Sequence, residues 1–171
     1  MLQPGEPSEQ TQNFEGTVPK ALADSAGYLL NEAAIVIREM DEAALAPLGI
    51  NPRQLGILKT IVASEPQTQQ AIGERNRIDR TTMVKLTDAL EQRGLIVRVV
   101  QPSDRRRYAL SLTPEGEAVL VKGRALVEGT QDQFLSPLTR GEWTQLRHLL
   151  TKLLATSDRG TVSSQRSSSQ A

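Results

Sequence analysis

Residues 78–94 read IDRTTMVKLTDALEQRG and predict a helix with one apolar face and one polar face. Asp79 is a favourable N-cap, and Gly94 supplies the stop. Met83, Leu86 and Leu90 follow the i, i+3, i+7 spacing of a single helical face. The other face carries a mixed set of side chains that is suited to contact with another molecule: Arg80, Thr81, Val84, Lys85 and Asp88.

The residues before this helix complete a helix-turn-helix. Residues 68–75 read TQQAIGER and predict a short helix capped by Thr68. Asn76 and Arg77 form a tight turn, and Ile78 is then placed to fill the gap between the two helices. Two helices joined in this way are the plan of the helix-turn-helix motif.

The residues after the helix predict a β-hairpin. Residues 95–100, LIVRVV, and residues 108–112, YALSL, are rich in β-forming residues, and QPSDRRR joins them. Three arginines at its tip make this hairpin a candidate wing. Arg98, within the first strand, is expected to point into solvent or towards phosphate.

Two more helices are predicted before this lobe. Over residues 19–46 the apolar residues alternate four and three positions apart, which predicts one long helix. Its apolar stripe is wide enough to need cover from two directions, either from a partner subunit or from a monomer's own core. Asn51, Pro52 and Gln54 form a capping box that opens the second helix, which ends before Pro66.

Two further helices are predicted after the hairpin. Residues 114–135 form the first, although Gly116, Gly123 and Gly129 dilute its apolar pattern. Thr139 and Glu142 form a capping box that opens an amphipathic last helix. The predicted fold class is therefore mainly α with a small β-hairpin wing.

The length is appropriate for one domain, over about residues 19–156. Within it, residues of about 50–113 form the winged helix-turn-helix lobe. Residues 1–18 and 157–171 are predicted to be disordered tails, because their polar composition offers little apolar surface to bury.

Basic residues are concentrated in the lobe. The chain carries 20 basic and 20 acidic residues and has no net charge. Residues 74–107, however, hold nine basic and five acidic residues. A basic lobe on an otherwise acidic chain is steered towards phosphate, and its affinity falls steeply as salt rises.

The composition excludes several classes of function. Cysteine is absent, so disulfides, thiolate catalysis and cysteine-bound zinc are excluded. His148, the one histidine, lies among leucines, where a place at a helix-packing or dimer surface is expected. No HExxH motif, phosphate-binding glycine loop or Ser/His/Asp order occurs, so we expect neither an enzyme nor a bound cofactor or metal. Without an apolar run of about 18 residues or a signal segment, a cytoplasmic location away from membranes is expected.

The order of these elements resembles the MarR family of bacterial transcriptional regulators. The likeness is carried by IDRTTMV at 78–84, LEQRGLI at 90–96, DRR at 104–106 and LSLTPEG at 110–116. It covers about residues 22–155 and implies a homodimer, whose dimerisation region contains the predicted helices at about 19–46 and 114–156. It also implies binding to a pseudo-palindromic double-stranded DNA operator, with half-sites about 10 bp apart.

On that geometry the helix at residues 78–94 enters the major groove. Arg80 is placed to reach a phosphate or a guanine edge, and Lys85 a phosphate. Thr81 and Thr82 are placed to hydrogen-bond phosphate or base, although Thr82 alternatively serves only its own helix end. Val84 is placed to pack on a thymine methyl group.

The wing is assigned to the minor groove by the same resemblance. Asp104 is expected to orient an arginine for insertion, because the family arranges such a pair in this way. Arg106 is the first choice for insertion and Arg105 the second, since a narrow minor groove concentrates negative potential.

The function expected from the resemblance is repression that is relieved by a small effector, for which aromatic or phenolic ligands are the family's common choice. An alternative is a winged-helix module that binds another protein or antagonises another regulator. Such a module has no use for Arg80, Lys85 and a wing tip with three arginines, which makes DNA binding the preferred interpretation.

Overall fold

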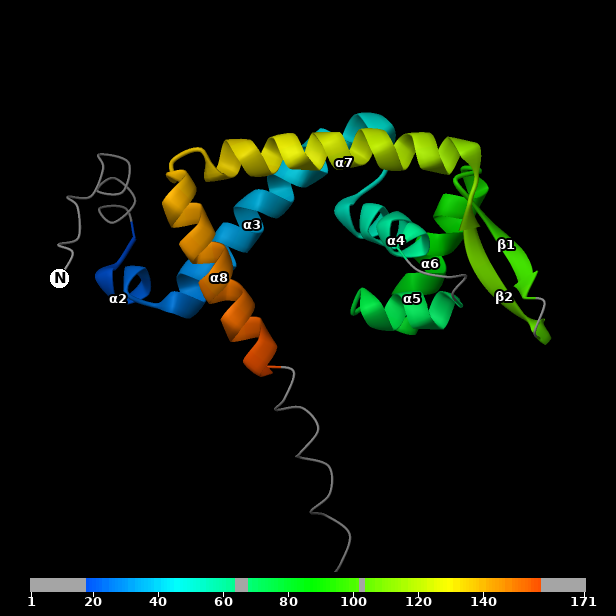
Figure 1. Ribbon diagram of the computed structural model, residues 1–171, viewed down its shortest axis with the longest axis horizontal. Helices are drawn as coiled ribbons and strands as arrows, with labels where there is room; N and C mark the ends of the chain where they lie inside the picture. The colour runs from blue at the N-terminus through cyan, green and yellow to red at the C-terminus, as the bar shows by residue number, and fades with distance from the viewer. Residues whose placement is uncertain (1–17, 64–67, 102–103, 158–171) are drawn as a thin grey trace, which may run out of the picture. The chain divides into compact units, whose positions relative to one another are not determined.

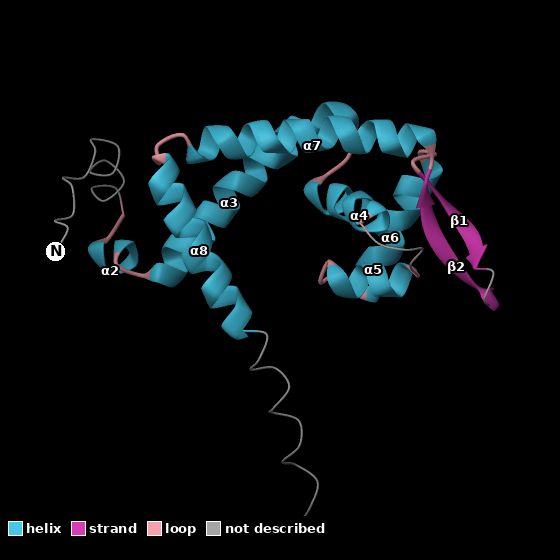
Figure 2. Ribbon diagram, in the orientation of Figure 1, coloured by secondary structure: helices cyan, strands magenta, loops and turns pink. Residues whose placement is uncertain are grey.

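The computed structural model describes residues 18–63, 68–101 and 104–157, with the side chains of residues 101–107, 156 and 157 left out. The predicted tails, apart from their inner edges, lie outside these residues, as does the end predicted for the second helix at Pro66. Figures 1 and 2 show that the described residues form helices and a β-hairpin. In chain order the elements are α2 (Lys20–Ala23), α3 (Ala26–Leu45), η1 (Ala46–Leu48), α4 (Pro52–Val62), α5 (Gln69–Arg75), α6 (Arg80–Gln92), β1 (Ile96–Gln101), β2 (Asp104–Leu112), α7 (Pro114–Leu135) and α8 (Arg140–Ser157).

The chain divides into two compact units, residues 1–130 and residues 131–171. The first unit holds the elements from α2 to β2 and most of α7, and it contains the winged helix-turn-helix. The second holds the end of α7 and α8. The predicted fold class, mainly α with a hairpin wing, is confirmed.

The single long helix predicted over residues 19–46 is wrong in one respect, because the structure breaks it in two. α2 ends at Ala23, and Ser25 then takes an extended backbone conformation with φ −89° and ψ 112°. The Ser25 hydroxyl accepts a hydrogen bond from the Tyr28 backbone N–H at 3.4 Å, so α3 begins with its own N-cap. The apolar periodicity runs through this break and therefore does not reveal it.

The capping box predicted at Asn51 is confirmed. The Asn51 side chain accepts a hydrogen bond from the Gln54 backbone N–H at 2.9 Å, and the Gln54 side chain accepts one from the Asn51 N–H at 3.1 Å. α4 then buries its apolar face in the core of the first unit. The largest fully buried side chains of that core include Leu45, Ile57, Leu58, Ile72, Met83, Leu90, Leu95 and Ile96.

α7 is one continuous helix, as predicted, and its start is fixed to the turn that follows α6. Thr113 donates its backbone N–H to the Leu95 carbonyl at 3.2 Å and its hydroxyl to the Gly94 carbonyl at 2.6 Å. The same hydroxyl accepts a hydrogen bond from the Gly116 N–H at 3.0 Å. Val119, Leu120 and Val127 of α7 belong to the same core cluster as the buried side chains of α4 and α6.

The hairpin is antiparallel and pairs Ile96 with Leu112, Arg98 with Leu110 and Val100 with Tyr108. The register shifts after Val100, so that Gln101 pairs with Asp104. Ile96 and Leu110 are buried, whereas Val100 and Tyr108 are about half exposed. The base of the hairpin is therefore part of the core, and its distal half extends away from it (Figure 2).

α8, in the second unit, begins at the capping box predicted for Thr139 and Glu142. The Glu142 carboxylate accepts hydrogen bonds from the Thr139 N–H at 2.7 Å and from its hydroxyl at 2.8 Å. These bonds lower the pKa of Glu142, the backbone bond having the larger effect. The start of this helix is thus determined by residues three positions apart.

Candidate nucleic-acid interface

α6 presents a polar surface because its other side is anchored in the core. The Asp79 carboxylate caps the helix by accepting the Thr82 backbone N–H at 2.9 Å, which lowers the pKa of Asp79. Met83, Thr87 and Leu90 are buried on the inner face. The predicted contact residues Arg80, Thr81, Val84 and Lys85 are all exposed, while Thr82 is half-buried.

Thr82 takes part in capping its own helix, because its N–H and also its hydroxyl hydrogen-bond the Asp79 carboxylate and so help to lower the pKa of Asp79. A hydroxyl on the inner face has a similar local role. Thr87 is fully buried, and its hydroxyl donates to the carbonyls of Met83 at 2.9 Å and Val84 at 3.0 Å. A polar side chain buried within the core is thereby satisfied inside its own helix.

The turn between α5 and α6 is held by the predicted residues. Thr68 caps α5 by accepting the Ala71 N–H at 3.3 Å. Asn76 donates its side-chain amide to the Thr60 hydroxyl at 2.9 Å and to the Ile72 carbonyl at 2.8 Å, which ties the turn to α4. Arg77 has a positive φ of 53°, and the chain then reverses into Ile78. Ile78 packs against the core, as expected for the residue between the two helices.

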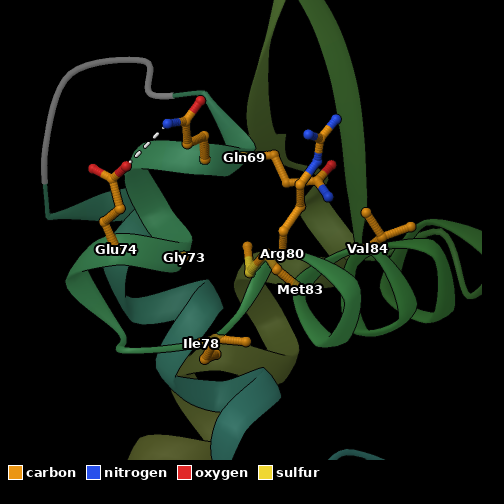
Figure 3. Close-up of a pocket in the computed structure, with 8 residues that line it drawn as sticks. Gln69, Gly73, Glu74, Ile78, Arg80, Met83 and Val84 are labelled. Carbon is orange, nitrogen blue, oxygen red and sulfur yellow. Dashed lines mark hydrogen bonds between the residues drawn. The ribbon is translucent and has the colours of Figure 1, made fainter.

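A groove lies between α5 and α6 on the same side as the exposed residues of α6. It is lined by Gln69, Gln70, Gly73, Glu74, Ile78, Arg80, Met83 and Val84. Figure 3 shows Arg80 and Val84 at one side and Glu74 at the other, with Glu74 accepting a hydrogen bond from Gln70 at 3.0 Å. The helix-turn-helix thus offers a concave, mixed surface in addition to the projecting face of α6.

The wing residues are placed by backbone only. Asp104, Arg105 and Arg106 are the first residues of β2, at the distal end of the hairpin. Their side chains lie outside the described part of the structure, so their assigned roles in the minor groove stay predictions. The backbone does put all three at the end of the hairpin that is remote from the core.

Arg98 is exposed, as predicted, but its side chain is also paired within the protein, which was not predicted. Its Nη2 atom lies 2.6 Å from Oδ1 of Asp88, and its Nη1 atom contacts Oε2 of Glu91. The hydrogen bond to Asp88 is the main reason why the pKa of Arg98 is raised above its usual value. Asp88, which was predicted to lie on the exposed face of α6, is therefore paired with Arg98 of β1.

Arg93 is a structural residue that sequence reasoning counted only as part of the basic lobe. It follows α6, and its guanidinium donates to the Leu48 carbonyl at 2.8 Å and to the Gly49 carbonyl. Gly49 has a positive φ of 64°, which turns the chain between η1 and α4. Arg93 thus ties the end of α6 to the turn that leads out of α3. No local pattern could reveal this contact, because its partners are more than 40 residues away in sequence.

Two features are absent from the described residues, a metal-binding cluster and a membrane-spanning helix. Among residues 18–63, 68–101 and 104–157, no three histidine or acidic side chains gather where they could hold a metal ion. Within the same part of the chain, no helix is both long and apolar enough to cross a membrane. His148 is exposed on α8.

Comparison with known proteins gives a consistent picture. Residues 48–107 match the MarR family. A protein of Thauera aromatica, named as a transcriptional regulatory protein for the hcr operon, is 31% identical over 134 residues, which are 78% of this chain and 81% of the relative.

Two solved structures extend the likeness to the fold. The transcriptional repressor CouR, bound to a 23-mer DNA duplex, is 33% identical, with 78% of this chain and 94% of that chain covered and a TM-score of 0.73. CouR from Rhodococcus jostii RHA1, bound to p-coumaroyl-CoA, is 28% identical, with 79% and 95% covered and a TM-score of 0.69.

Proposed function

The chain belongs to the MarR family of transcriptional regulators, and from this we propose that it is a homodimeric repressor that binds a pseudo-palindromic DNA operator. One observation carries the proposal. α6 is capped and buried along one side, and the other side exposes Arg80, Thr81 and Lys85 in a winged helix-turn-helix. A rigid helix with exposed cationic and hydroxyl side chains is suited to the major groove.

Within this proposal some contacts position the protein on the DNA backbone, and others read the base sequence. Lys85 binds phosphate and supplies affinity that depends on salt but not on sequence. Arg80, at the first turn of α6, reaches a guanine edge or a phosphate, and Val84 packs on a thymine methyl group. The wing, with Arg106 foremost, enters the flanking minor groove, where Arg105 and Asp104 support it.

The proposal of a homodimer is supported by apolar side chains that stay exposed in each unit. In the first unit, Leu29, Leu30 and Val36 of α3 are each more than 40% exposed. In the second unit, Leu149, Leu153 and Leu154 of α8 are between 48% and 65% exposed. Apolar side chains clustered along helices in this way are typical of surfaces that another chain covers.

Effector control is the further part of the proposal. CouR, a related repressor, has been crystallised with p-coumaroyl-CoA, a thioester of a phenolic acid. We therefore infer that a small aromatic or phenolic compound releases this protein from its operator. A ligand that binds the DNA-free form more tightly shifts the population away from the complex.

A gel-shift titration tests the proposal most directly. The purified protein is titrated against DNA from its own upstream intergenic region, and against random DNA of equal length, at two salt concentrations. Selective binding that weakens at the higher salt is expected. Arg106→Ala should weaken binding markedly, and Arg124→Ala, which removes a charge from the exposed side of α7, should not.

Two results would count against the proposal. Equal affinity of the wild type and Arg106→Ala would remove the assignment of the wing. Binding no stronger than to random DNA, both here and in a genome-wide binding experiment, would instead favour the module that binds another protein.

A further inference from the structure

Three charged side chains join the hairpin to α6. Arg98 lies in β1, whereas Asp88 and Glu91 lie three residues apart in the second half of α6 and so share one face of that helix. The guanidinium contacts both carboxylates, with 2.6 Å between Nη2 and Oδ1 of Asp88. One cation thus bridges two anions that belong to the same helix.

The position of Arg98 along β1 lets the bridge hold the hairpin beyond its buried base. Alternate residues of a strand share a face, so Arg98 points to the same side as buried Ile96, one step closer to the tip. The next residue on this face, Val100, is about half exposed together with its cross-strand partner Tyr108. Ile96 therefore anchors the base of the hairpin, and Arg98 extends that anchorage towards the tip.

The bridge also changes the charge next to the exposed face of α6. Asp88 lies three residues after Lys85 and four after Val84, so it borders the exposed face of α6. A carboxylate there repels an approaching phosphate. Arg98 neutralises one of the two negative charges and holds both carboxylates towards the hairpin. The side chains are about 34–45% exposed, so this effect is felt at the surface that phosphate approaches.

We propose that Arg98 is a positioning residue for DNA binding, which sets the wing against α6 and offsets the charge of Asp88 and Glu91 without itself touching DNA. This inference depends on the proposed function. It differs from a direct phosphate contact in one measurable way. If Arg98 acts through the two carboxylates, its importance must disappear when they are neutralised.

A double-mutant cycle measures that dependence. The probe is a duplex that the wild-type protein enriches from a randomised pool. The variants are Arg98→Gln, the pair Asp88→Asn with Glu91→Gln, and the combination of all three. Arg98→Gln alone should weaken binding about tenfold, and in the neutralised background the same change should alter affinity less than about twofold. Arg124→Gln serves as a control for net charge and should stay within about twofold of the wild type.

Footprinting separates the wing from α6. In the Arg98→Gln complex, hydroxyl-radical protection of the flanking minor groove should weaken while protection of guanine N7 in the major groove persists. Circular dichroism should show that every variant is folded, because all substitutions are polar and at partly exposed positions.

The outcomes distinguish a failure of this inference from a failure of the proposed function. An equal loss of affinity in both backgrounds would show that Arg98 contacts DNA directly and would overturn the inference alone. Equal weakening of both footprints would also overturn it, because the wing would then not be selectively released. A wild-type protein that enriches no duplex would refute the proposed function, and the inference with it.

Discussion

Gly116→Ala should destabilise the protein strongly, although alanine is the better helix former. Gly116 is buried in the first turn of α7, against the backbone of Leu95. A Cβ atom there would overlap the Leu95 carbonyl oxygen and come within 2.9 Å of the carbonyl carbon. The obstacle is backbone rather than the end of a flexible side chain, so the start of α7 has to move.

The size of the effect follows from what that movement disrupts. Thr113 forms two hydrogen bonds to the backbone of Gly94 and Leu95, and each contributes about 1 kcal/mol. Overpacking adds about 1–3 kcal/mol. The better helix propensity of alanine returns about 1 kcal/mol. The expected net loss of unfolding free energy is about 2–4 kcal/mol.

Gly129→Ala, in the same helix, is the matched control. A Cβ atom at Gly129 would have no atom within 4 Å, so the substitution should stabilise the protein by about 0.5–1 kcal/mol. Urea denaturation followed by circular dichroism measures both changes, with protein concentration held constant because the stability of the proposed dimer would depend on it. If both variants shift the midpoint in the same direction, the close approach of α7 to Leu95 is not what selects glycine.

Three further changes have defined outcomes. Lys85→Ala should weaken binding to all DNA sequences alike and lower the salt slope by about one unit; a loss confined to one sequence would argue for base readout instead. Arg93→Ala should cost about 1–3 kcal/mol in urea denaturation, because the carbonyls of Leu48 and Gly49 lose their donor; an unchanged midpoint would show that this contact is dispensable. The lowered pKa of Asp79 means that its charged cap stabilises the fold above the unfolded-state pKa of about 4, and that this stabilisation is lost as the pH falls through the lower folded-state pKa. The stability advantage of the wild type over Asp79→Ala should therefore be full near neutrality and shrink in acid, and a constant advantage down to about pH 2 would contradict the assignment.

Helix starts were largely predictable because capping is local. Asp79, Asn51 and Thr139 each bond to a group three residues away, so neighbouring residues alone identify them. Ser25 obeys the same chemistry but sits inside an uninterrupted apolar period. There the period concealed the cap, and one helix was predicted where the structure has two.

The role of the glycines in α7 could not be predicted from neighbouring residues. By sequence, Gly116 and Gly123 weaken the apolar pattern of a predicted helix. In the structure both are buried, and a Cβ atom at Gly123 would come within 2.9 Å of the Leu55 side chain. They allow α7 to approach its neighbours closely. Propensity counts only the cost of glycine within its own helix and not the contact that glycine permits.

In the candidate interface, too, the sequence predicted the local features and missed the contacts between distant residues. The sequence by itself determined which side of α6 faces outwards, because helical periodicity links each residue to those three and four positions away. It did not determine the partners of Arg98 or Arg93. Those contacts span separations of 7 and 10 residues for Arg98 and more than 40 for Arg93. Only tertiary packing decided these contacts. A long charged side chain pairs with the groups that the fold brings within its reach, and the sequence shows the charge but not which groups will lie near it.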